Sequence, residues 1–466
     1  MAAGDSDCDL IVIGSGPAGE KGAAQAAYFG KRVVVVEKEA APGGAAVHTG
    51  TLPSKTLRET ALFLSGHRQR ELYGIHVALD PVHAVPRLLS RKEAVRAQEV
   101  ERIRWNLDRH GVEVVRGAAR VIDPHAVEVD TPEGARRIAA AVILIATGSV
   151  PFQPGHIPFA DPAIDDSDTI LEIDRLPASL LVMGGGVIGC EYASMFAALG
   201  VAVTLVEPRA ELLGFLDADM SEALRAALVS MGVDVRLEDS AVEVRREGDR
   251  IVTRLGSGQV VESERLLFAA GRQGATAGLG LEALGVAVDA RRFVVVDEEF
   301  KTAVPSIRAA GDVVGFPALA SVSMEQARVA VCHAFGFAYK REVSGLLPYG
   351  IYTIPEVSAV GMSEEDARAR GTGVVCGRAP YRLNTRGKIC GDQDGMVKLV
   401  FEGESRRLVG AHVIGERATE LVHIGQAIIA LGGTVETLID MVFNHPTLAE
   451  CYKYAAYDAL GRWAPA

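Results

Sequence analysis

Two stretches of the chain repeat one another without a gap. Asp9 to Glu37 is DLIVIGSGPAGEKGAAQAAYFGKRVVVVE, and Ser179 to Glu207, 170 positions later, is SLLVMGGGVIGCEYASMFAALGVAVTLVE. Each copy predicts an apolar strand, the pattern G-x-G-x-x-G, an alanine-rich helix and a second strand that ends in glutamate. One such pattern is weak evidence in a chain with 50 glycines. Two copies in register, each between a predicted strand and a predicted helix, indicate two dinucleotide-binding units.

The three glycines of such a unit have separate physical roles. The first makes a tight turn, the second lets a pyrophosphate approach the backbone, and the third lets the helix pack closely on the strand. Glu37 and Glu207, each eighteen positions past the third glycine, are placed to accept hydrogen bonds from an adenosine ribose. Two such sites suggest one tightly held redox cofactor and one exchanging nicotinamide nucleotide. The alternative is that one copy keeps only the fold. The glycines are Gly14, Gly16 and Gly19 in the first copy and Gly184, Gly186 and Gly189 in the second.

Charge and hydropathy exclude two classes of partner. The chain has 48 basic and 60 acidic residues, so its formal net charge of −12 repels nucleic acid and anionic lipid. Its longest apolar run, Ile138 to Ala146, is about half as long as a membrane-spanning helix, and the first residues lack the pattern of a signal peptide. We therefore expect a cytoplasmic protein that binds neither nucleic acid nor membranes.

The cysteines and histidines predict neither a dithiol motif nor a metal site. The closest two cysteines are fourteen positions apart, so no C-x-x-C is present. Their scatter indicates reduced thiols, and a disulfide between cysteines distant in sequence is the less favoured alternative. The histidines lack the spacing of metal ligands, so no metal is predicted. The six cysteines are Cys8, Cys190, Cys332, Cys376, Cys390 and Cys451.

The order of the motifs resembles that of the flavoprotein disulfide reductase family from about Cys8 to Arg462. After the first glycine loop come a GG…G…PSK segment, ATGS, GGGVIGCE, AGR, AAGD and HPTLAE. The resemblance implies an α/β fold with two doubly wound dinucleotide-binding domains and an α+β carboxy-terminal dimerisation domain. An FAD domain would span 1–150, an NAD(P) domain 151–274, a central segment completing the FAD site 275–345, and the interface domain of a homodimer 346–466.

The resemblance also implies which residues bind the cofactors. Lys55 and Glu191 resemble the family's ion pair beside the flavin N5, where a cation favours the reduced flavin and a carboxylate offsets the burial of that cation. The alternative for Lys55 is a surface lysine on a helix. FAD would be held by Gly14, Gly16, Gly19, Glu37, Gly44, Thr147, Gly148, Asp312 and the backbone near Ala320. NAD(H) or NADP(H) would be held by Gly184, Gly186, Ile188, Gly189, Glu207 and the backbone near Gly271.

The segment from Pro42 to Lys55, PGGAAVHTGTLPSK, lacks the redox cysteines of that family. Ala46 and Thr51 stand at their positions, and neither residue forms a thiolate or a disulfide. Dithiol chemistry at this position is excluded. The hydride transfer from a nicotinamide C4 to the flavin N5 is retained, followed by transfer to another acceptor. A second nicotinamide nucleotide as acceptor would make the protein a ping-pong transhydrogenase.

The chain is further similar to the soluble FAD-dependent pyridine nucleotide transhydrogenases. That subfamily shares H-x-G-T-[IL]-P-S-K, matched by His48 to Lys55, and GVIGCEYAS, matched by Gly186 to Ser194. The stretch LLGFLD, Leu212 to Asp217, is also similar. The leading prediction is therefore hydride exchange between NADPH and NAD through a bound flavin.

Two positions depart from this subfamily. Ala46 replaces its first cysteine, and His445 stands where tyrosine is typical. His445 and Glu450 instead resemble the acid and base pair of true disulfide reductases. They would form an interface hydrogen bond, or protonate another acceptor such as a quinone. An NAD(P)H dehydrogenase (diaphorase) that reduces quinones is therefore an alternative function, and a flavin-binding regulatory subunit without turnover is another.

Two residues bear on the preference between NAD(H) and NADP(H), and each favours a different one. Glu207 favours NAD(H), because a 2′-phosphate would meet its carboxylate. Arg209 is close enough in sequence to turn toward that phosphate. A transhydrogenase must accept both nucleotides.

Overall fold

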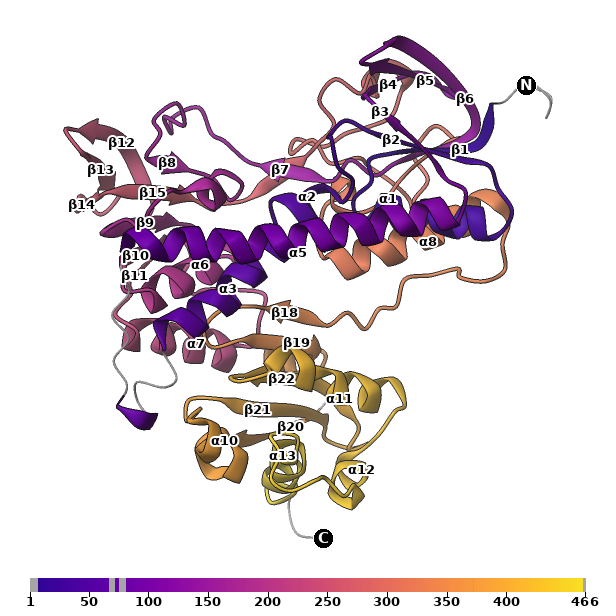
Figure 1. Ribbon diagram of the computed structural model, residues 1–466. Coiled ribbons are helices and arrows are strands. Elements are labelled where there is room, and N and C mark those ends of the chain that lie inside the picture. The colour runs from indigo at the N-terminus through magenta and orange to yellow at the C-terminus, as the bar shows by residue number, and fades with distance from the viewer. Residues whose placement is uncertain (1–6, 67–71, 75–80, 372, 464–466) are drawn as a thin grey trace. The chain divides into compact units, whose positions relative to one another are not determined.

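The structure is a computed structural model that describes residues 7–66, 72–74, 81–371 and 373–463 (Figure 1). The chain forms two compact units. The first comprises Met1–Thr56, Leu89–Phe152 and Gly271–Ser344, and the second comprises Leu57–Leu88, Gln153–Ala270 and Gly345–Ala466. In the described part of the chain, no helix is both long enough and apolar enough to cross a membrane.

A mixed sheet is the centre of the first unit. It consists of β1 (Cys8–Ile13), β2 (Val33–Glu37), β3 (Glu113–Arg116), β4 (Ala118–Asp123), β5 (Ala126–Thr131), β6 (Gly134–Ile145) and β17 (Ile307–Ala309). The order is β3-β2-β1-β6-β5-β4, and β17 also pairs with β6. Pairing is parallel among β3, β2, β1, β6 and β17, whereas β4, β5 and β6 form an antiparallel meander.

Both faces of the parallel part are buried, which explains its continuously apolar strands. Along β1, Ile11 belongs to one hydrophobic core and Leu10 to the other. Helices α1 (Pro17–Tyr28) and α8 (Ala320–Phe335) lie side by side over the second core (Figure 1). Gly22 of α1 permits this approach, because a Cβ there would lie 2.8 Å from Leu144 and 3.3 Å from Ala327.

Shorter elements complete the first unit, and two longer helices follow β2. The short elements are α2 (Gly44–His48), the antiparallel pair β7 (Ser149–Pro151) and β16 (Arg272–Gly274), and the 3-10 helices η2 (Glu282–Leu284) and η3 (Asp312–Val314). The longer helices are α3 (Thr51–Ser65) and α5 (Pro81–Arg109).

The second unit contains a parallel sheet built like the centre of the first. Its strands are β8 (Ile164–Asp165), β9 (Ser179–Met183), β10 (Ala202–Glu207), β11 (Asp234–Leu237) and β15 (Arg265–Phe268), in the order β11-β10-β9-β15-β8. Helix α6 (Val187–Ala198) connects β9 to β10, and α7 (Ala218–Ser230) connects β10 to β11. An antiparallel sheet of β12 (Ala241–Glu247), β13 (Arg250–Leu255) and β14 (Val260–Ser263) follows, and η1 (Thr169–Glu172) precedes β9.

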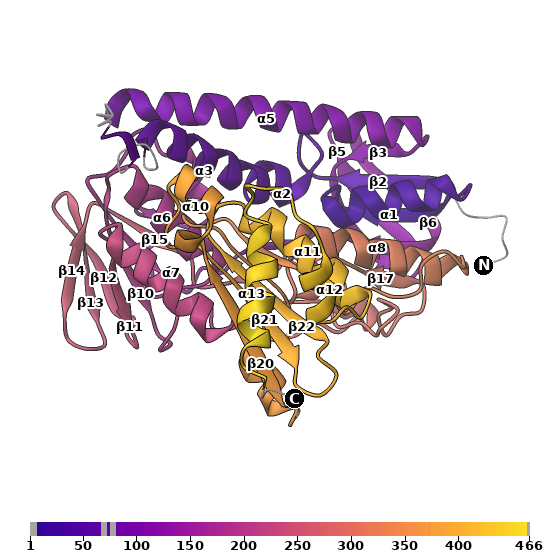
Figure 2. The same ribbon diagram turned by 90° about the horizontal axis from the view of Figure 1, so that it is seen from below.

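The carboxy-terminal part of the second unit is an antiparallel sheet with helices. Its strands are β18 (Tyr349–Ile351), β19 (Val357–Gly361), β20 (Val374–Pro380), β21 (Met396–Glu402) and β22 (Leu408–Ile414), in the order β18-β19-β22-β21-β20. The helices are α9 (Glu364–Ala369), η4 (Tyr381–Leu383), α10 (Thr385–Cys390), α11 (Ala418–Ala430), α12 (Val435–Asp440) and α13 (Glu450–Leu460). Helix α13 packs on β20 and β21 (Figure 2).

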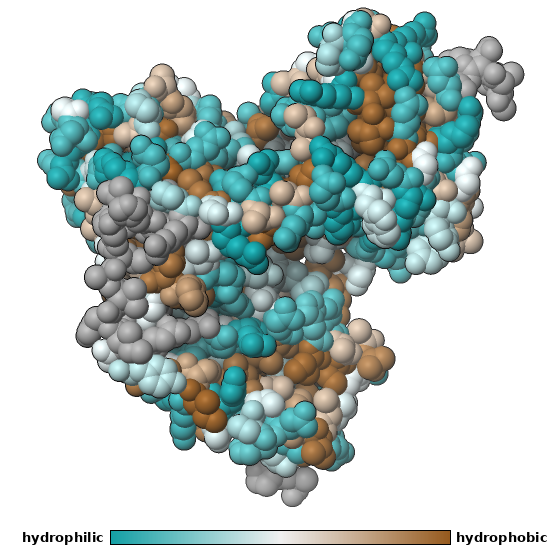
Figure 3. All heavy atoms as spheres, viewed as in Figure 1, coloured by the Kyte–Doolittle hydropathy of each residue, from teal (hydrophilic) through white to brown (hydrophobic). Residues whose placement is uncertain are grey.

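This carboxy-terminal part exposes many large apolar side chains. Leu431 is 84% exposed and Val442 is 93% exposed. Figure 3 shows hydrophobic residues on the visible face around α11 and α12. Single exposed apolar side chains are common on protein surfaces, so these residues alone do not define a contact surface. The others are Leu383, Ile389, Tyr454 and Tyr457.

The predicted fold class is confirmed: each unit has parallel strands with a glycine-loop connection, and the chain ends in an α+β part. The division into four domains with boundaries at 150, 274 and 345 stays a prediction.

Candidate functional site

The first glycine loop joins β1 to α1 and has no room for side chains at two of its three glycines. Gly14 has a φ of +100°, and a Cβ there would lie 2.5 Å from the Ala146 carbonyl oxygen. A Cβ on Gly19 would lie 1.9 Å from the Gly14 carbonyl oxygen. Gly16 precedes α1 with no side-chain cap among the described residues. The first helical N–H groups are therefore available to an anion.

The second loop, between β9 and α6, repeats this geometry. Gly184 has a φ of +112°, and a Cβ on Gly189 would lie 1.8 Å from its carbonyl oxygen. A Cβ on Gly186, by contrast, would meet no described atom within 4 Å. Ile188 is the second residue of α6 and is partly exposed. The open space in front of Gly186 lies where a pyrophosphate would approach the helix.

Each loop holds the glutamate at the end of its second strand. The Glu37 Oε2 accepts hydrogen bonds from the Ser15 backbone N–H at 2.9 Å and the Ser15 hydroxyl at 2.5 Å. The Glu207 Oε2 accepts one from the Gly185 N–H at 2.6 Å. Both carboxylates are buried and fixed beside the glycines, each close to where an adenosine ribose would lie.

The two copies differ two residues after the glutamate, where the first has Glu39 and the second has Arg209. The Arg209 Nε lies 3.3 Å from the Glu207 Oε1, and the Arg209 side chain is 68% exposed. An ion pair this exposed is weak, so the guanidinium is able to turn to another anion. At this position, therefore, the second site has a cation and the first has a carboxylate.

Further groups of the first unit fit a bound dinucleotide. A Cβ on Gly44 would lie 2.9 Å from the Gly16 Cα, so these two backbone segments touch. Thr147 follows β6, and its buried hydroxyl has no hydrogen-bond partner among the described residues. Next to it, Gly148 has a φ of +72° and accepts a hydrogen bond from Ala275. The Thr147 hydroxyl is buried, lacks a hydrogen-bond partner among the described residues and lies next to a glycine. It is therefore suited to bind a polar ligand such as FAD.

Asp312 connects three segments of the same unit. Its Oδ1 accepts a hydrogen bond at 3.0 Å from Ser323 of α8, the helix that begins at Ala320, and its Oδ2 lies 3.5 Å from the Ser149 hydroxyl. The preceding Gly311 N–H donates to the Gln326 side chain at 2.8 Å. The Asp312 carboxylate is therefore fixed on η3, with its orientation set by α8.

Lys55 and Glu191 lie in different units, so their predicted ion pair stays a prediction. Lys55, on α3, is half-buried and donates to the Ser54 hydroxyl at 3.4 Å. Glu191, on α6, is 4% exposed and accepts a hydrogen bond from the Tyr352 N–H at 2.9 Å. Gly271, with a φ of +133°, belongs to the first unit, and its predicted part in the second site also stays a prediction.

All six cysteines are free thiols. Ala46 lies on α2 and Thr51 begins α3, so these two helices carry no sulfur where the resemblance places the redox pair. Burial raises the pKa of Cys8 to about 11 and those of Cys376 and Cys451 to about 12. Thiols with such pKa values are poor nucleophiles at neutral pH.

His445 and Glu450 form the predicted pair. The His445 Nδ1 lies 3.1 Å from both Glu450 carboxylate oxygens, and the Thr447 N–H also donates to that carboxylate at 3.1 Å. Burial would raise the pKa of Glu450, but the hydrogen bonds from Thr447 and His445 lower it below its usual value. The imidazole is 64% exposed. Among the described residues, no group of His, Cys, Asp and Glu is arranged to hold a metal ion.

The sequence did not predict the residues that form hydrogen bonds with the predicted site residues. Ser15 holds Glu37, and Ser323 holds Asp312. Ser15 occupies the variable position of the first G-x-G, so its hydroxyl beside the ribose carboxylate was a usable signal. Ser323 is eleven residues from Asp312, on another element, and nothing in the local pattern indicates their contact.

Two family models together match most of the described chain. Residues 8–334 match the model of the pyridine nucleotide-disulphide oxidoreductase family, and residues 347–456 match its dimerisation domain. The soluble pyridine nucleotide transhydrogenase of Mycobacterium bovis is 46% identical over 460 residues, with 97% of both chains covered. That of Pseudomonas putida is 38% identical over 458 residues, with 97% of this chain and 98% of the relative covered.

Two solved structures share the fold over nearly the full length of this chain. LpdA from Mycobacterium tuberculosis superposes with a TM-score of 0.88 at 29% identity, covering 96% of this chain and 99% of LpdA. The HOCl-induced flavoprotein disulfide reductase RclA from Escherichia coli gives a TM-score of 0.87 at 29% identity, with 96% and 99% covered.

Gly186 and Gly189 of the second loop should respond differently to one added methyl group. Gly186→Ala should leave the melting temperature unchanged and weaken NADH binding by about tenfold, because its methyl enters the space in front of α6. Gly189→Ala should destabilise the protein by roughly 1–3 kcal/mol, because its methyl would overlap the Gly184 carbonyl. Thermal denaturation and NADH fluorescence titration measure both. Wild-type NADH affinity in Gly186→Ala would contradict this use of the loop.

Proposed function

This chain belongs to the pyridine nucleotide-disulphide oxidoreductase family, and on that premise we propose that it is an FAD-dependent transhydrogenase that exchanges hydride between NADPH and NAD⁺ without a redox disulfide. One observation carries the proposal. Both glycine loops and their glutamates are intact, whereas Ala46 and Thr51 replace the cysteines that a disulfide reductase needs. Relatives that are 38–46% identical over nearly the full length carry the name soluble pyridine nucleotide transhydrogenase, which supports it.

The first unit has the residues to hold the flavin cofactor. FAD, when bound, accepts a hydride from one nicotinamide nucleotide and returns it to another, so no second redox centre is required. The N–H groups at the start of α1 would bind its pyrophosphate, and Glu37 its adenosine ribose. The Thr147 hydroxyl, which has no partner among the described residues, and the Asp312 carboxylate, which can accept further hydrogen bonds, would bind the rest of the molecule.

The second unit would bind the exchanging nucleotide. The N–H groups at the start of α6 face the space in front of Gly186, and Glu207 would accept hydrogen bonds from the ribose. Lys55 would supply a cation beside the flavin ring, and Glu191 would offset the burial of that cation. These roles also argue against a flavin-binding subunit without turnover, which would need neither Lys55 nor Glu191.

The same proposal extends to domains and assembly. We assign FAD binding to 1–150 and 275–345, nucleotide binding to 151–274 and dimerisation to 346–466. The match to a dimerisation domain supports a homodimer. The free state of all six cysteines supports a cytoplasmic location.

A quinone is the second candidate acceptor, and one pair of residues favours it. His445 and Glu450 are joined at 3.1 Å, and the imidazole is exposed, although Ala46 and Thr51 leave them no thiolate to protonate. An imidazole oriented by a carboxylate is suited to donate a proton to the oxygen of a quinone that is being reduced.

Anaerobic stopped-flow absorbance distinguishes the two acceptors. NADPH should bleach the flavin absorbance, and subsequent mixing with NAD⁺ should restore it at a rate that supports turnover. Fast recovery with a quinone and slow recovery with NAD⁺ would overturn the transhydrogenase proposal in favour of a diaphorase. His445→Gln is the control: it should slow recovery with the quinone alone, because hydride return to NAD⁺ needs no proton donor.

Arg209 should select for the 2′-phosphate. Arg209→Ala is expected to raise KM for NADPH by about tenfold and to change KM for NADH by less than about twofold, because only NADPH has an anion for the guanidinium to bind. Steady-state kinetics with each donor measures this difference. Glu39→Ala, at the matching position of the first loop, should change neither KM. An equal rise for NADH and NADPH would refute the role.

A further inference from the structure

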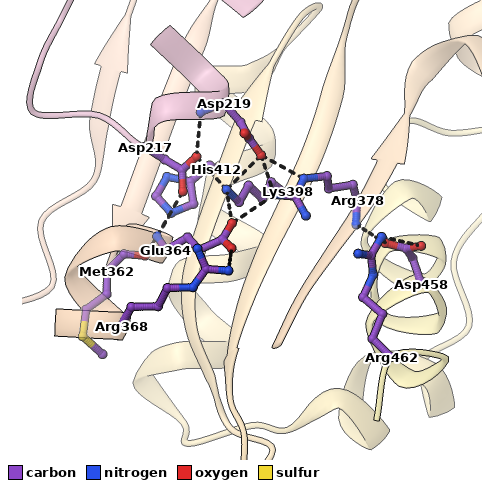
Figure 4. A network of polar contacts seen from close by, with 10 residues as sticks. All are labelled: Asp217, Asp219, Met362, Glu364, Arg368, Arg378, Lys398, His412, Asp458 and Arg462. Carbon is purple, nitrogen blue, oxygen red and sulfur yellow. Dashed lines mark hydrogen bonds and ion pairs between the residues drawn. The ribbon is translucent and has the colours of Figure 1, made fainter. Parts of the chain in front are cut away.

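A buried lysine joins the start of α7 to the carboxy-terminal sheet within the second unit (Figure 4). Lys398 of β21 is only 1% exposed. Its Nζ lies 2.8 Å from the Asp217 Oδ1, 2.9 Å from the Asp219 Oδ2 and 2.7 Å from the Glu364 Oε2. Three carboxylates from two helical segments therefore converge on one ammonium group.

The ammonium group belongs to a row of basic side chains across the sheet. Arg378 on β20 and His412 on β22 are the register partners of Lys398. Arg378 donates to Asp219 at 2.6 and 2.8 Å and to Glu364 at 2.9 Å. Burial keeps the pKa of His412 below its usual value, so this imidazole adds no charge at neutral pH. Arg368 also pairs with Glu364, so three cations balance three carboxylates.

Such a network is poorly explained by stability alone. Burying a lysine and a carboxylate costs hydration energy, and apolar side chains of similar size often stabilise a fold equally well or better. What an ion-pair network adds is a defined arrangement of its members.

Asp217 is connected to the nucleotide loop by a short series of hydrogen bonds. It ends the segment that follows Glu207 and caps α7 by accepting from the Asp219 N–H. Within this segment, the Leu216 N–H donates to the Leu213 carbonyl at 2.8 Å, and the Leu213 N–H donates to the Gly185 carbonyl at 3.0 Å. Gly185 in turn donates to Glu207.

Leu213 shows that this segment is held under constraint. Its φ of +49° lies in the left-handed region, which a leucine adopts only where its surroundings impose it. Its side chain is 2% exposed, and a Cβ on Gly185 would lie 2.6 Å from the neighbouring Leu212. The segment 208–217 is thus pressed against the glycine loop at one end and fixed to Lys398 at the other.

We propose that Lys398 is a positioning residue for the nicotinamide nucleotide site: by holding Asp217 it fixes segment 208–217 against Gly185 and keeps Glu207 aligned for the adenosine ribose. The inference deepens the proposed function and rests on it. It assigns to the carboxy-terminal sheet a part in nucleotide affinity, although no residue of that sheet need contact the nucleotide.

Removing the ammonium group has a definite physical consequence. Asp217, Asp219 and Glu364 would then repel one another at close range, and the segment would populate other conformations. Only molecules in the original conformation would then bind the nucleotide. The apparent affinity is therefore the original affinity multiplied by the fraction of molecules in that conformation. The hydride step, which occurs after binding, is unaffected.

The test uses full-length holoprotein and Lys398→Met, with Arg368→Met as the matched control. Arg368 is 65% exposed and pairs with Glu364, so its loss leaves the Asp217 contact intact. Calorimetric titration with NAD⁺ and with ADP-ribose should give Kd values about fivefold higher in Lys398→Met, with kcat at saturation within about twofold of wild type. Amide hydrogen exchange in 208–217 should be faster. Arg368→Met should match wild type in every measurement.

Unchanged Kd values and unchanged exchange in a folded Lys398→Met protein would overturn the inference. If Lys398→Met does not fold, Asp217→Ser replaces it, since the hydroxyl keeps the helix cap but has no charge for Lys398 to bind, and the same criteria apply. The proposed function fails separately: wild-type protein would then bind neither NAD⁺ nor ADP-ribose, or would bind both without hydride exchange.

Discussion

The structure depends on one steric contact that occurs twice. In each glycine loop the third glycine lies against the carbonyl of the first, so closely that a Cβ would come within 1.9 Å in one copy and 1.8 Å in the other. This contact presses α1 onto β1 and α6 onto β9, which brings the helix N-termini and the second-strand glutamates to the same edge of each sheet. Any side chain at these positions would separate helix from strand and disperse the groups that bind a dinucleotide.

The two copies have diverged around this shared contact in ways that suit different ligands. In the first, the Ser15 hydroxyl donates to Glu37 and accepts from the Gly43 N–H at 3.1 Å, and Gly44 closes against Gly16. Those contacts enclose one side of the loop, as a tightly held cofactor requires. The second loop has Gly185 instead of Ser15, and open space in front of its helix. That arrangement suits a nucleotide that must leave after each turnover.

The repeat was predictable from sequence because everything that defines it is local. Glycine spacing, strand periodicity and the terminal glutamate lie within 29 residues of one another, and the structure reproduces both units. The absence of a redox pair was equally plain from Ala46 and Thr51. Long-range contacts were not predictable: Asp217 and Lys398 are 181 residues apart, and no local pattern pairs a helix cap with a strand lysine. Lys55 and Glu191 remain paired only by resemblance.

The central claim, that electrons pass through a flavin with no sulfur relay, is tested most directly by an anaerobic reductive titration of the holoprotein with dithionite. FAD alone takes up about two electrons, whereas FAD together with a redox disulfide takes up about four. We predict complete reduction at about two electrons per FAD, because all six cysteines are free thiols. Uptake of about four would reveal a second redox centre and contradict the account.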